Sequence, residues 1–336
     1  MFRFNEYISP EYTEQFYLLE EELSKTESVI DGLDAAEIMR SSFHGEINLS
    51  PVGIVAAIFN ELLSYLTGNL DIILTVLFIA LVASYTFVLS GKNGNLNEIC
   101  NSASGILAAI YIGMLFSMTV EFTKDAAEGM EAVMLSVLPL IAALGLNKGS
   151  ITFVLCAQGV SLVISYIFIP LSIIYGGLGL TEPLTDKFPL NELRSGIKSI
   201  FLWGLGLVMT VFSCITAITG AVVSQFAGVT GKTVKYAGNL IPFVGSYLSE
   251  SADLVFSGVN ALRSSAGIGA ATAVFITGIY PFLKLLAYVI TLRICSFFVK
   301  SFYVKSIANV IDNTIEAITM MMAMTALLGV FFIINI

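Results

Sequence analysis

Long apolar runs follow one another along most of the chain, separated by shorter polar stretches. A membrane-spanning helix needs about 20 apolar residues to cross roughly 30 Å of hydrocarbon, and it must satisfy its own backbone hydrogen bonds. Asn60 and Glu61 interrupt the first run and leave it marginal, whereas the later runs qualify. We predict spanning helices within residues 51–67, 71–90, 99–120, 150–180, 198–220, 266–299 and 313–336.

Two further apolar pieces, residues 130–146 and 234–248, are too short to cross comfortably. Each has a proline near its middle, Pro139 in the first and Pro242 in the second. Proline removes one backbone donor and its ring clashes with the preceding turn, so a straight helix is disfavoured there. We expect half-helices or re-entrant hairpins, with protein or water shielding the unpaired backbone groups.

The run 266–299 is longer than a membrane is thick, because as a helix it would measure about 51 Å. We expect Pro281 to kink it, with Lys284 and Arg293 at or beyond the interface. These two basic side chains allow two interpretations. They snorkel towards the interface, which is the simpler explanation, or they carry charge inside the membrane and line a cavity.

The order of these parts occurs twice, in units of about 99–180 and 198–300. Each unit has a spanning helix, a polar loop, a proline-containing segment that closes at Gly145 or Gly245, and a long run broken by a further proline. Duplicated halves with broken segments at matching positions are typical of transporters, in which the broken segments form the binding site. Chance similarity between apolar segments is the alternative to an internal repeat.

Residues 1–50 differ in character from residues 51–336, and we treat the two as separate regions. The first region has eleven acidic and three basic residues, and its Ser9-Pro10-Glu11 is a typical helix start. Apolar residues then recur at intervals of three and four, which predicts an acidic amphipathic helix outside the bilayer. This helix either docks a partner or folds back on the membrane domain. The first residues lack the regions of a signal peptide.

Composition supports the assignment to the membrane. Hydrophobic residues make up 56% of the chain and charged residues 12%, and the mean hydropathy is +0.87. A soluble domain has roughly 25% charged residues, because it must cover its surface with groups that water solvates. We therefore expect an all-α, polytopic helical bundle in a lipid bilayer. The net charge of −9 arises mainly from residues 1–50, and no basic surface for nucleic acid is present.

Catalytic chemistry is not expected. His44, in the acidic region, is the only histidine, so the membrane domain offers neither a Ser-His-Asp site nor histidine ligation of zinc. Gly231-Lys232-Thr233 resembles part of a nucleotide loop, but Phe226 occupies the position of the required earlier glycine. The four cysteines are widely spaced and form no metal or redox motif. We expect no enzymatic activity and no cofactor, and ATP hydrolysis would have to come from a partner.

One stretch of the second region carries a family resemblance. A basic-Thr-x-Lys start at Lys232 to Lys235 leads into Gly238-Asn239-Leu240-Ile241-Pro242-Phe243-Val244-Gly245 and then an Ala-Asp pair ending at Asp253. This stretch resembles the signature of the stage III sporulation protein AE family. Further matches follow the family's order and extend the resemblance to about residues 50–336: Leu138-Pro139-Leu140, Val208-Met209-Thr210-Val211-Phe212, Gly267-Ile268-Gly269 and Pro281-Phe282-Leu283-Lys284.

The resemblance and the broken segments together give a set of candidate structural or binding residues. They are Pro139, Gly145, Lys232, Lys235, Gly238, Asn239, Pro242, Gly245, Asp253, Pro281 and Lys284. Asn239 and Asp253 have an alternative role as helix caps around the Pro242 break. The resemblance supplies no catalytic residue.

The resemblance implies a multi-pass protein of the outer forespore membrane, made in the mother cell. It implies a non-enzymatic subunit of the stage III A assembly, a trans-envelope channel or secretion-like complex needed for forespore development. The implied partners are the other proteins of that assembly, among them a cytoplasmic ATPase and ring-forming proteins, and a forespore protein.

The alternative is a permease that moves a small solute between the Pro139 and Pro242 segments. Polarity inside the bilayer distinguishes the two functions. A scaffold needs only small residues at its packing faces. A solute path needs facing polar groups, such as Asn239, Lys284, Glu61 and Gln158.

Overall fold

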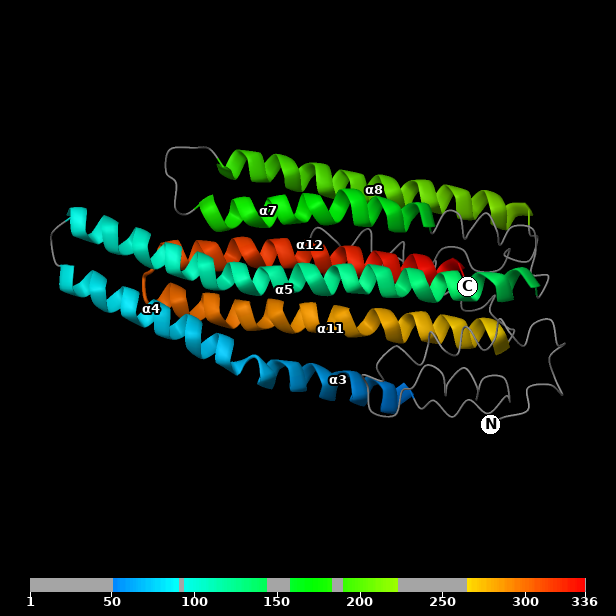
Figure 1. Cartoon of the computed structure of the whole chain (residues 1–336), viewed down its shortest axis with the longest axis horizontal. Coiled ribbons are helices and arrows are strands. Elements are labelled where there is room, and N and C mark those ends of the chain that lie inside the picture. Colours follow the sequence, from blue (N-terminus) through cyan, green and yellow to red (C-terminus); the bar gives the residue numbers. More distant parts are fainter. Residues whose placement is uncertain (1–50, 91–93, 144–157, 183–189, 223–264, 336) are drawn as a thin grey trace.

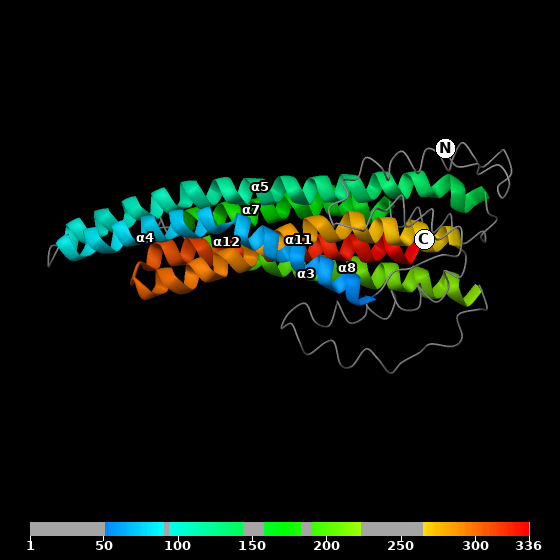
Figure 2. The same cartoon turned by 90° about the horizontal axis from the view of Figure 1, so that it is seen from below.

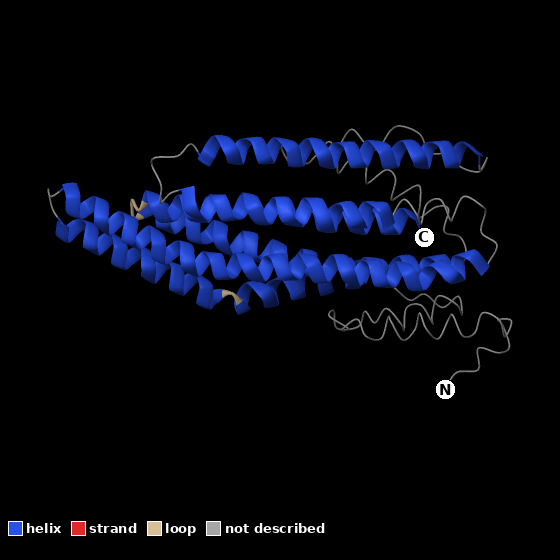
Figure 3. Ribbon diagram, turned by 45° about the horizontal axis from the view of Figure 1, so that its top comes forward, coloured by secondary structure: helices blue, strands red, loops and turns tan. Residues whose placement is uncertain are grey.

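The computed structural model describes residues 51–90, 94–143, 158–182, 190–222 and 265–335. These residues are helical apart from two short breaks, and no strand occurs among them (Figure 3). The predicted all-α fold is confirmed. A helix covers residues 158–181; it contains the π-helical turn η2 (Ile164–Phe168) and ends with α7 (Ile169–Thr181). The other helices are α3 (Pro51–Gly68), α4 (Leu70–Ser90), α5 (Gly94–Ala143), α8 (Leu190–Val222), α11 (Ser265–Ser301) and α12 (Lys305–Asn335).

All the helices lie along the long axis of one elongated bundle (Figures 1 and 2). α5, α11 and α12 form its centre, α7 and α8 lie on one side, and α3 and α4 lie on the other. Six stretches of the described residues are long and apolar enough to cross a membrane. The protein is therefore a multi-pass membrane protein.

Successive spans alternate in direction. α4, α7 and α11 finish, and α5, α8 and α12 begin, at one end of the bundle, here called the loop end (Figure 1). α3 begins, and α12 finishes, at the opposite end, here called the terminal end. The α4–α5 hairpin projects past the other helices at the loop end (Figures 1 and 2).

α3 and α4 form one crossing, although the sequence predicted two. They run end to end in the same direction, and together they make the span Val52–Thr86 (Figure 1). Only Asn69 separates them, and one residue is too few to reverse the chain. Its carbonyl accepts a hydrogen bond from the N–H of Ile72 at 3.2 Å, and its side-chain amide donates to the Thr291 hydroxyl of α11 at 3.5 Å.

α5 corrects a second expectation. The sequence predicted a span over 99–120 and a separate broken segment around Pro139, but α5 is continuous over 50 residues, a length of about 75 Å. Pro139 lies four residues before the end of the helix at Ala143, so the backbone hydrogen bond that it removes falls in the last turns. The other predicted broken segment, 234–248, lies outside the described residues.

Pro170 and Pro281 sit inside helical stretches. Pro170 is the second residue after the π-helical turn and lies in the first positions of α7, where the backbone donor that proline lacks is tolerated best. Pro281 is buried within α11, which is helical on both sides of it.

The core lies between α11 and α12, with α5 packed against both. Aromatic pairs join the outer helices to this core: Phe212 of α8 lies 4.3 Å from Phe331 of α12, and Phe201 of α8 lies 5.2 Å from Phe168 of η2, measured between ring centroids. Large apolar side chains also remain exposed along the outside, as lipid-facing helices require.

The internal repeat stays a prediction. Its second proline-containing segment lies outside the described residues, and the helices proposed to match have different neighbours. α5 packs against α7, α11 and α12, whereas α8 packs mainly against α7.

Candidate functional site

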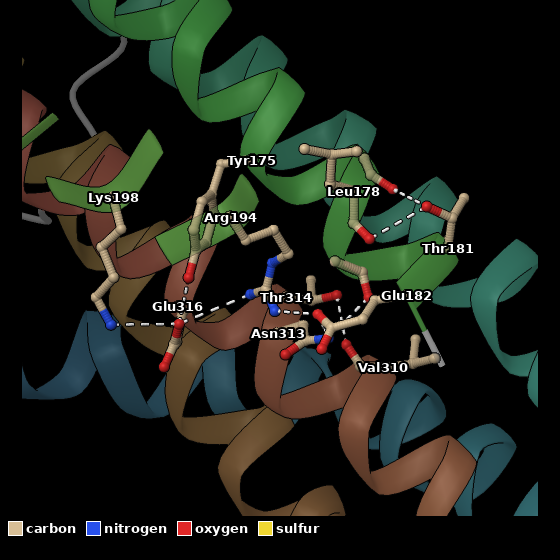
Figure 4. Close-up of polar contacts among 12 residues, drawn as sticks. Tyr175, Leu178, Thr181, Glu182, Arg194, Lys198, Val310, Asn313, Thr314 and Glu316 are labelled. Carbon is tan, nitrogen blue, oxygen red and sulfur yellow. Dashed lines mark hydrogen bonds and ion pairs between the residues drawn. The ribbon is translucent and has the colours of Figure 1, made fainter. Parts of the chain in front are cut away.

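Polar side chains from different helices gather at two places in the bundle, and some of them, such as Glu316, are exposed. The first, here called the Arg194 cluster, consists of Tyr175, Glu182, Arg194, Lys198, Asn313 and Glu316 (Figure 4). The second, here called the Lys284 cage, consists of Tyr65, Phe122, Tyr280 and Lys284. Glu316 and Lys284 both lie near the middle of candidate membrane spans.

Three helices build the Arg194 cluster. The short connection 183–189 makes α7 and α8 antiparallel neighbours, so Glu182 at the end of α7 comes beside Arg194 in the first turns of α8. The N-terminal half of α12 is polar in sequence and supplies Asn313 and Glu316 one turn apart. Side chains of three helices that are separate in sequence therefore meet in one cluster (Figure 4).

Arg194 is the buried centre of the cluster. Its side chain is 5% exposed, and its Nη1 lies 2.5 Å from Oε2 of Glu182. The Asn313 amide donates to the same Glu182 oxygen at 3.2 Å and to the carbonyl of Gly179 at 2.9 Å. Glu182 is therefore held by one cation and one neutral donor, and α12 is tied to the end of α7.

Glu316 receives the second set of donors. The Tyr175 hydroxyl donates to it, Lys198 Nζ lies 3.3 Å from its Oε2, and Arg194 Nη2 lies 3.7 Å from the same oxygen. The guanidinium carbon of Arg194 also lies 4.5 Å from the centroid of the Tyr175 ring, within the range of a cation–π interaction. Two carboxylates and two cations thus balance within the cluster (Figure 4).

Gly179 permits this packing. A Cβ at this position would lie 2.9 Å from Cβ of Asn313 and 3.3 Å from Nε of Arg194. Among the described residues, Arg194 Nε and Nη2 have no hydrogen-bond acceptor, so the guanidinium relies on its ion pairs and on the Tyr175 ring. A buried charge with few alternative partners makes each existing pair important.

The Lys284 cage surrounds an ammonium group with aromatic rings from three helices. Lys284 Nζ lies 4.2 Å from the ring centroid of Tyr280, 4.7 Å from that of Phe122 and 6.0 Å from that of Tyr65. The Tyr65 and Tyr280 rings meet edge to face at 5.9 Å, and Glu61 lies beside the Tyr65 hydroxyl. Such rings attract a cation through the negative charge of their faces.

This geometry bears on the two interpretations of the basic residues on α11. The half-buried Lys284 side chain points to rings of α3, α5 and α11, which favours a charge held between the helices. Arg293 is exposed. The aromatic rings attract the half-buried ammonium group of Lys284.

Smaller polar contacts join other helices. Ser161 donates to Glu131 of α5 at 2.8 Å, and Ser296 of α11 donates to Asp312 of α12 at 2.6 Å. Lys300 lies 2.8 Å from the other oxygen of Asp312. These contacts fix neighbouring helices at both ends of the bundle.

The structure places few of the residues singled out from the sequence. Pro139 lies near the end of α5, and Pro281 and Lys284 lie one turn apart on α11, so they do not form one site. The remaining candidates lie outside the described residues: Gly145, Lys232, Lys235, Gly238, Asn239, Pro242, Gly245 and Asp253.

Sequence reasoning missed the Arg194 cluster. Its residues lie at the edges of three different runs, where charge usually means an interface with water. Asn313 and Glu316 inside the last predicted span were the available signal, because ionisable residues within a span are costly. Their partners on α7 and α8 could not be chosen without knowing which helices are neighbours.

Comparisons with known proteins agree with the resemblance. The family model for stage III sporulation protein AE matches residues 33–336. The chain is 19% identical over 306 residues to the stage III sporulation protein AE of Bacillus subtilis (strain 168), which covers 87% of this chain and 76% of that protein. No solved structure matches the chain. A match over nearly the whole membrane domain, together with its helical architecture, means that this chain belongs to the stage III sporulation protein AE family.

Proposed function

We propose that the protein is a non-enzymatic subunit of the stage III A sporulation channel, in the outer forespore membrane. Family membership makes it a sporulation membrane protein, and the match over residues 33–336 carries the proposal. Its partners in this proposal are the other proteins of the assembly, including a cytoplasmic ATPase and ring-forming proteins, and a forespore protein across the gap.

The packing of the described helices supports a scaffold role. Small residues let large ones approach closely at several crossings: Gly113 meets Leu180, and Gly176 lies against the Phe116 ring. In membranes, such contacts take the place of the hydrophobic effect in holding helices together. The charges of the Arg194 cluster neutralise one another, as expected of a structural element.

The second candidate, a permease, is favoured by one observation. Lys284 and Glu61 converge on Tyr65 near the middle of the candidate spans, and a scaffold alone does not need charge there. Intramembrane ionisable residues commonly mark ion or substrate paths. Because the aromatic rings already occupy the space around the ammonium, we rank this candidate second.

A deletion strain tests the first proposal. We expect loss of heat-resistant spores when the gene is deleted in its own sporulating host, and recovery when the intact gene is restored. An affinity-tagged copy isolated from sporulating cells should bring the other stage III A proteins with it. Normal spore yield, or isolation of the protein without them, contradicts the proposal.

One variant separates the two candidates. Lys284→Met removes the intramembrane ammonium while keeping a long apolar side chain. A scaffold should keep its partners and most of its spore yield in this variant, because a single charge contributes little to subunit contacts. A permease should lose spore yield while the assembly still co-purifies. Arg293→Met, at an exposed position of the same helix, is the control.

A further inference from the structure

The turn between α11 and α12 joins two helices that both cross the membrane. The candidate spans Val274–Ser301 and Lys305–Phe332 stop on either side of residues 302–304. Because three residues are far too few to cross a bilayer, this turn lies at one of its surfaces. Each span has 28 residues, or about 42 Å as a helix, close to the roughly 40–45 Å of a bilayer with its headgroups. The lengths of the two helices therefore place their joined ends at headgroup level.

Tyr303 adopts an unusual backbone conformation in this turn. Its φ is 60°, and no other non-glycine residue in the described part of the chain has a positive φ. Glycine is the usual residue in this conformation, because a side chain crowds the backbone there. The N–H of Tyr303 donates to the carbonyl of Lys300 at 3.2 Å and closes the end of α11. The side chain is 85% exposed, so packing against the described helices does not compensate for the crowding.

Two phenylalanines on the last turns of α11 also point outward. Phe297 is 70% exposed and Phe298 is 43% exposed, and their ring centroids lie 5.5 Å apart in an edge-to-face arrangement. Rings of this kind belong in hydrocarbon, whereas a tyrosine favours the boundary between hydrocarbon and water. The order along the chain, with the phenylalanine pair before Tyr303, matches the order in which α11 would leave a bilayer.

Three cations accompany the rings. Arg293, Lys300 and Lys305 are all exposed. Arg293, Phe297 and Lys300 follow one another at intervals of four and three residues, which puts them on one side of α11. Among the described residues, the one acid paired with any of these cations is Asp312, 2.8 Å from Lys300. Three cations against one acid leave this surface positive.

The long undescribed stretches of the chain adjoin the other end of the bundle. Residues 1–50, 144–157 and 223–264 are joined in sequence to helix ends at the terminal end (Figure 1). To reach the α11–α12 turn, any of them would have to pass the bilayer. At the loop end, only residues 91–93 and 183–189 lie between described helices without being described themselves. The outward side of the turn is therefore left to the surrounding lipid.

We propose that the α11–α12 turn binds the headgroup of an anionic phospholipid of the surrounding bilayer. Lys300 and Lys305 attract its phosphate, and Arg293 extends its side chain towards the same level. The phenylalanine pair packs against the upper part of the acyl chains. The Tyr303 ring lies at the boundary, where its ring meets hydrocarbon and its hydroxyl meets water. This inference does not depend on the channel role proposed above.

The mixture of groups favours a lipid over a soluble partner. A soluble acidic protein would match the cations but would leave the Phe297 ring without an apolar neighbour of its own. An anionic lipid supplies both parts at once, because its phosphate and its acyl chains are covalently joined. Each basic residue near an anionic membrane surface raises the affinity about fivefold.

Fluorescence quenching tests the contact directly. Trp203 is the one tryptophan of the chain, so Phe297→Trp in a Trp203→Phe background gives a single reporter at the turn. The purified full chain is placed in phosphatidylcholine vesicles that contain a minor share of a brominated lipid, which quenches on contact. We expect brominated phosphatidylglycerol to bind beside the reporter at least about fivefold more tightly than brominated phosphatidylcholine. Lys300→Gln together with Lys305→Gln should remove this preference.

Three controls accompany the measurement. Lys124→Gln removes an exposed charge from α5, away from the turn, and should keep the preference. The unaltered Trp203, exposed on α8, should be quenched equally by the two lipids. Inorganic phosphate is compared with chloride at equal ionic strength. A lipid site keeps its preference in phosphate, whereas a site for the free anion loses it.

Tyr303→Gly provides an independent measurement. Glycine relieves the crowded backbone, so this variant should be at least as stable as the parent protein in detergent alone. Phosphatidylglycerol added to the detergent should raise the melting temperature of the parent protein more than phosphatidylcholine does, since a ligand of the folded state stabilises it. The extra rise should be smaller in Tyr303→Gly and absent in the double lysine variant.

Each outcome counts for or against the proposal. A preference for phosphatidylglycerol at residue 297 that disappears with the two lysines supports it. Equal quenching by the two lipids overturns it, and so does weak quenching by both, since a protein then covers the turn. A preference of the same size at Trp203, or its loss in phosphate, also overturns it, because general attraction or a free-anion site then accounts for the binding.

Discussion

Arg194 and Glu182 form an ion pair 2.5 Å long between the first turns of α8 and the end of α7. They are 12 residues apart in sequence, and the chain reverses direction between them. Arg194 is almost fully buried, so this pair lies in a medium where an unpaired charge is costly. The contact makes the α7–α8 hairpin and its packing on α12 depend on each other.

Removing one partner of this pair should be worse than removing both. Arg194→Met leaves the Glu182 carboxylate without its cation, and we expect a loss of about 3–5 kcal/mol in stability. The double variant Arg194→Met with Glu182→Met should recover a large part of that loss, because no uncompensated charge remains. Thermal unfolding in detergent, monitored as the loss of monodisperse protein on a sizing column, measures the stability of the single and the double variant.

Lys198 provides the control for this experiment. It contacts the same cluster but is 40% exposed, so Lys198→Met should cost no more than about 1 kcal/mol. If Arg194→Met is as mild as Lys198→Met, the buried pair does not hold the hairpin in place.

Neighbouring glycines on α7 should respond differently to the same change. A Cβ at Gly176 would overlap the Phe116 ring of α5, whereas one at Gly177 meets no atom within 4 Å. We expect Gly176→Ala to destabilise the protein by about 1–3 kcal/mol, because overpacking moves the helices apart. Gly177→Ala should be neutral or slightly stabilising, since alanine favours the helix.

The same unfolding assay compares the two glycine variants. Adding Phe116→Leu to Gly176→Ala should return part of the lost stability by making room for the methyl group. Equal stability of the two alanine variants would mean that α5 and α7 do not approach as closely as the structure shows.

The Lys284 cage should couple α3 to α11. Lys284→Met and Tyr65→Leu each remove one side of a cation–π contact, which contributes about 0.5–2 kcal/mol. The double variant should then cost less than the sum of the single variants, and the difference in a double-mutant cycle measures the coupling. Additive losses would show that the ammonium and the ring are independent.

The alternating direction of the six candidate spans in the described residues predicts which of their ends share a compartment. Tyr303, at the turn between α11 and α12, is exposed, and Lys92 and Lys187 belong in sequence to the segments that join α4 to α5 and α7 to α8. Cysteines at these three positions should all react with a membrane-impermeant maleimide from the same side of a vesicle. Tags before Met1 and after Ile336 should be reached from the opposite side. A split result among the three cysteines contradicts the six-span arrangement.

Asn239 remains a prediction from the sequence alone. It belongs to the stretch that resembles the family signature and lies outside the described residues. We expect Asn239→Ala to reduce co-purification of partner proteins and spore yield more than Leu240→Ala does. Equal effects would mean that the amide has no special role.

Much of the fold follows from the hydrophobic pattern. A run of about 20 apolar residues can satisfy its backbone in lipid only as a helix, so the runs around α4, α8, α11 and α12 were predictable one by one. The exact lengths of the helices could not be predicted. Residues 51–67 and 71–90 were expected to be two spans, and Pro139 to lie in a separate segment, but Asn69 contacts α11 within one α3–α4 crossing and α5 continues through Pro139 near its end.

The sequence by itself determined that this is an all-helical, multi-pass membrane protein of a sporulation family with an acidic N-terminal region, because composition and local pattern carry that information. Only the tertiary structure decided which charges meet. Glu182, Arg194 and Glu316 belong to three separate runs, and Lys284 finds Tyr65 and Phe122 on two other helices. Such contacts depend on which helices are neighbours and at what depth, and side-chain periodicity within one helix encodes neither.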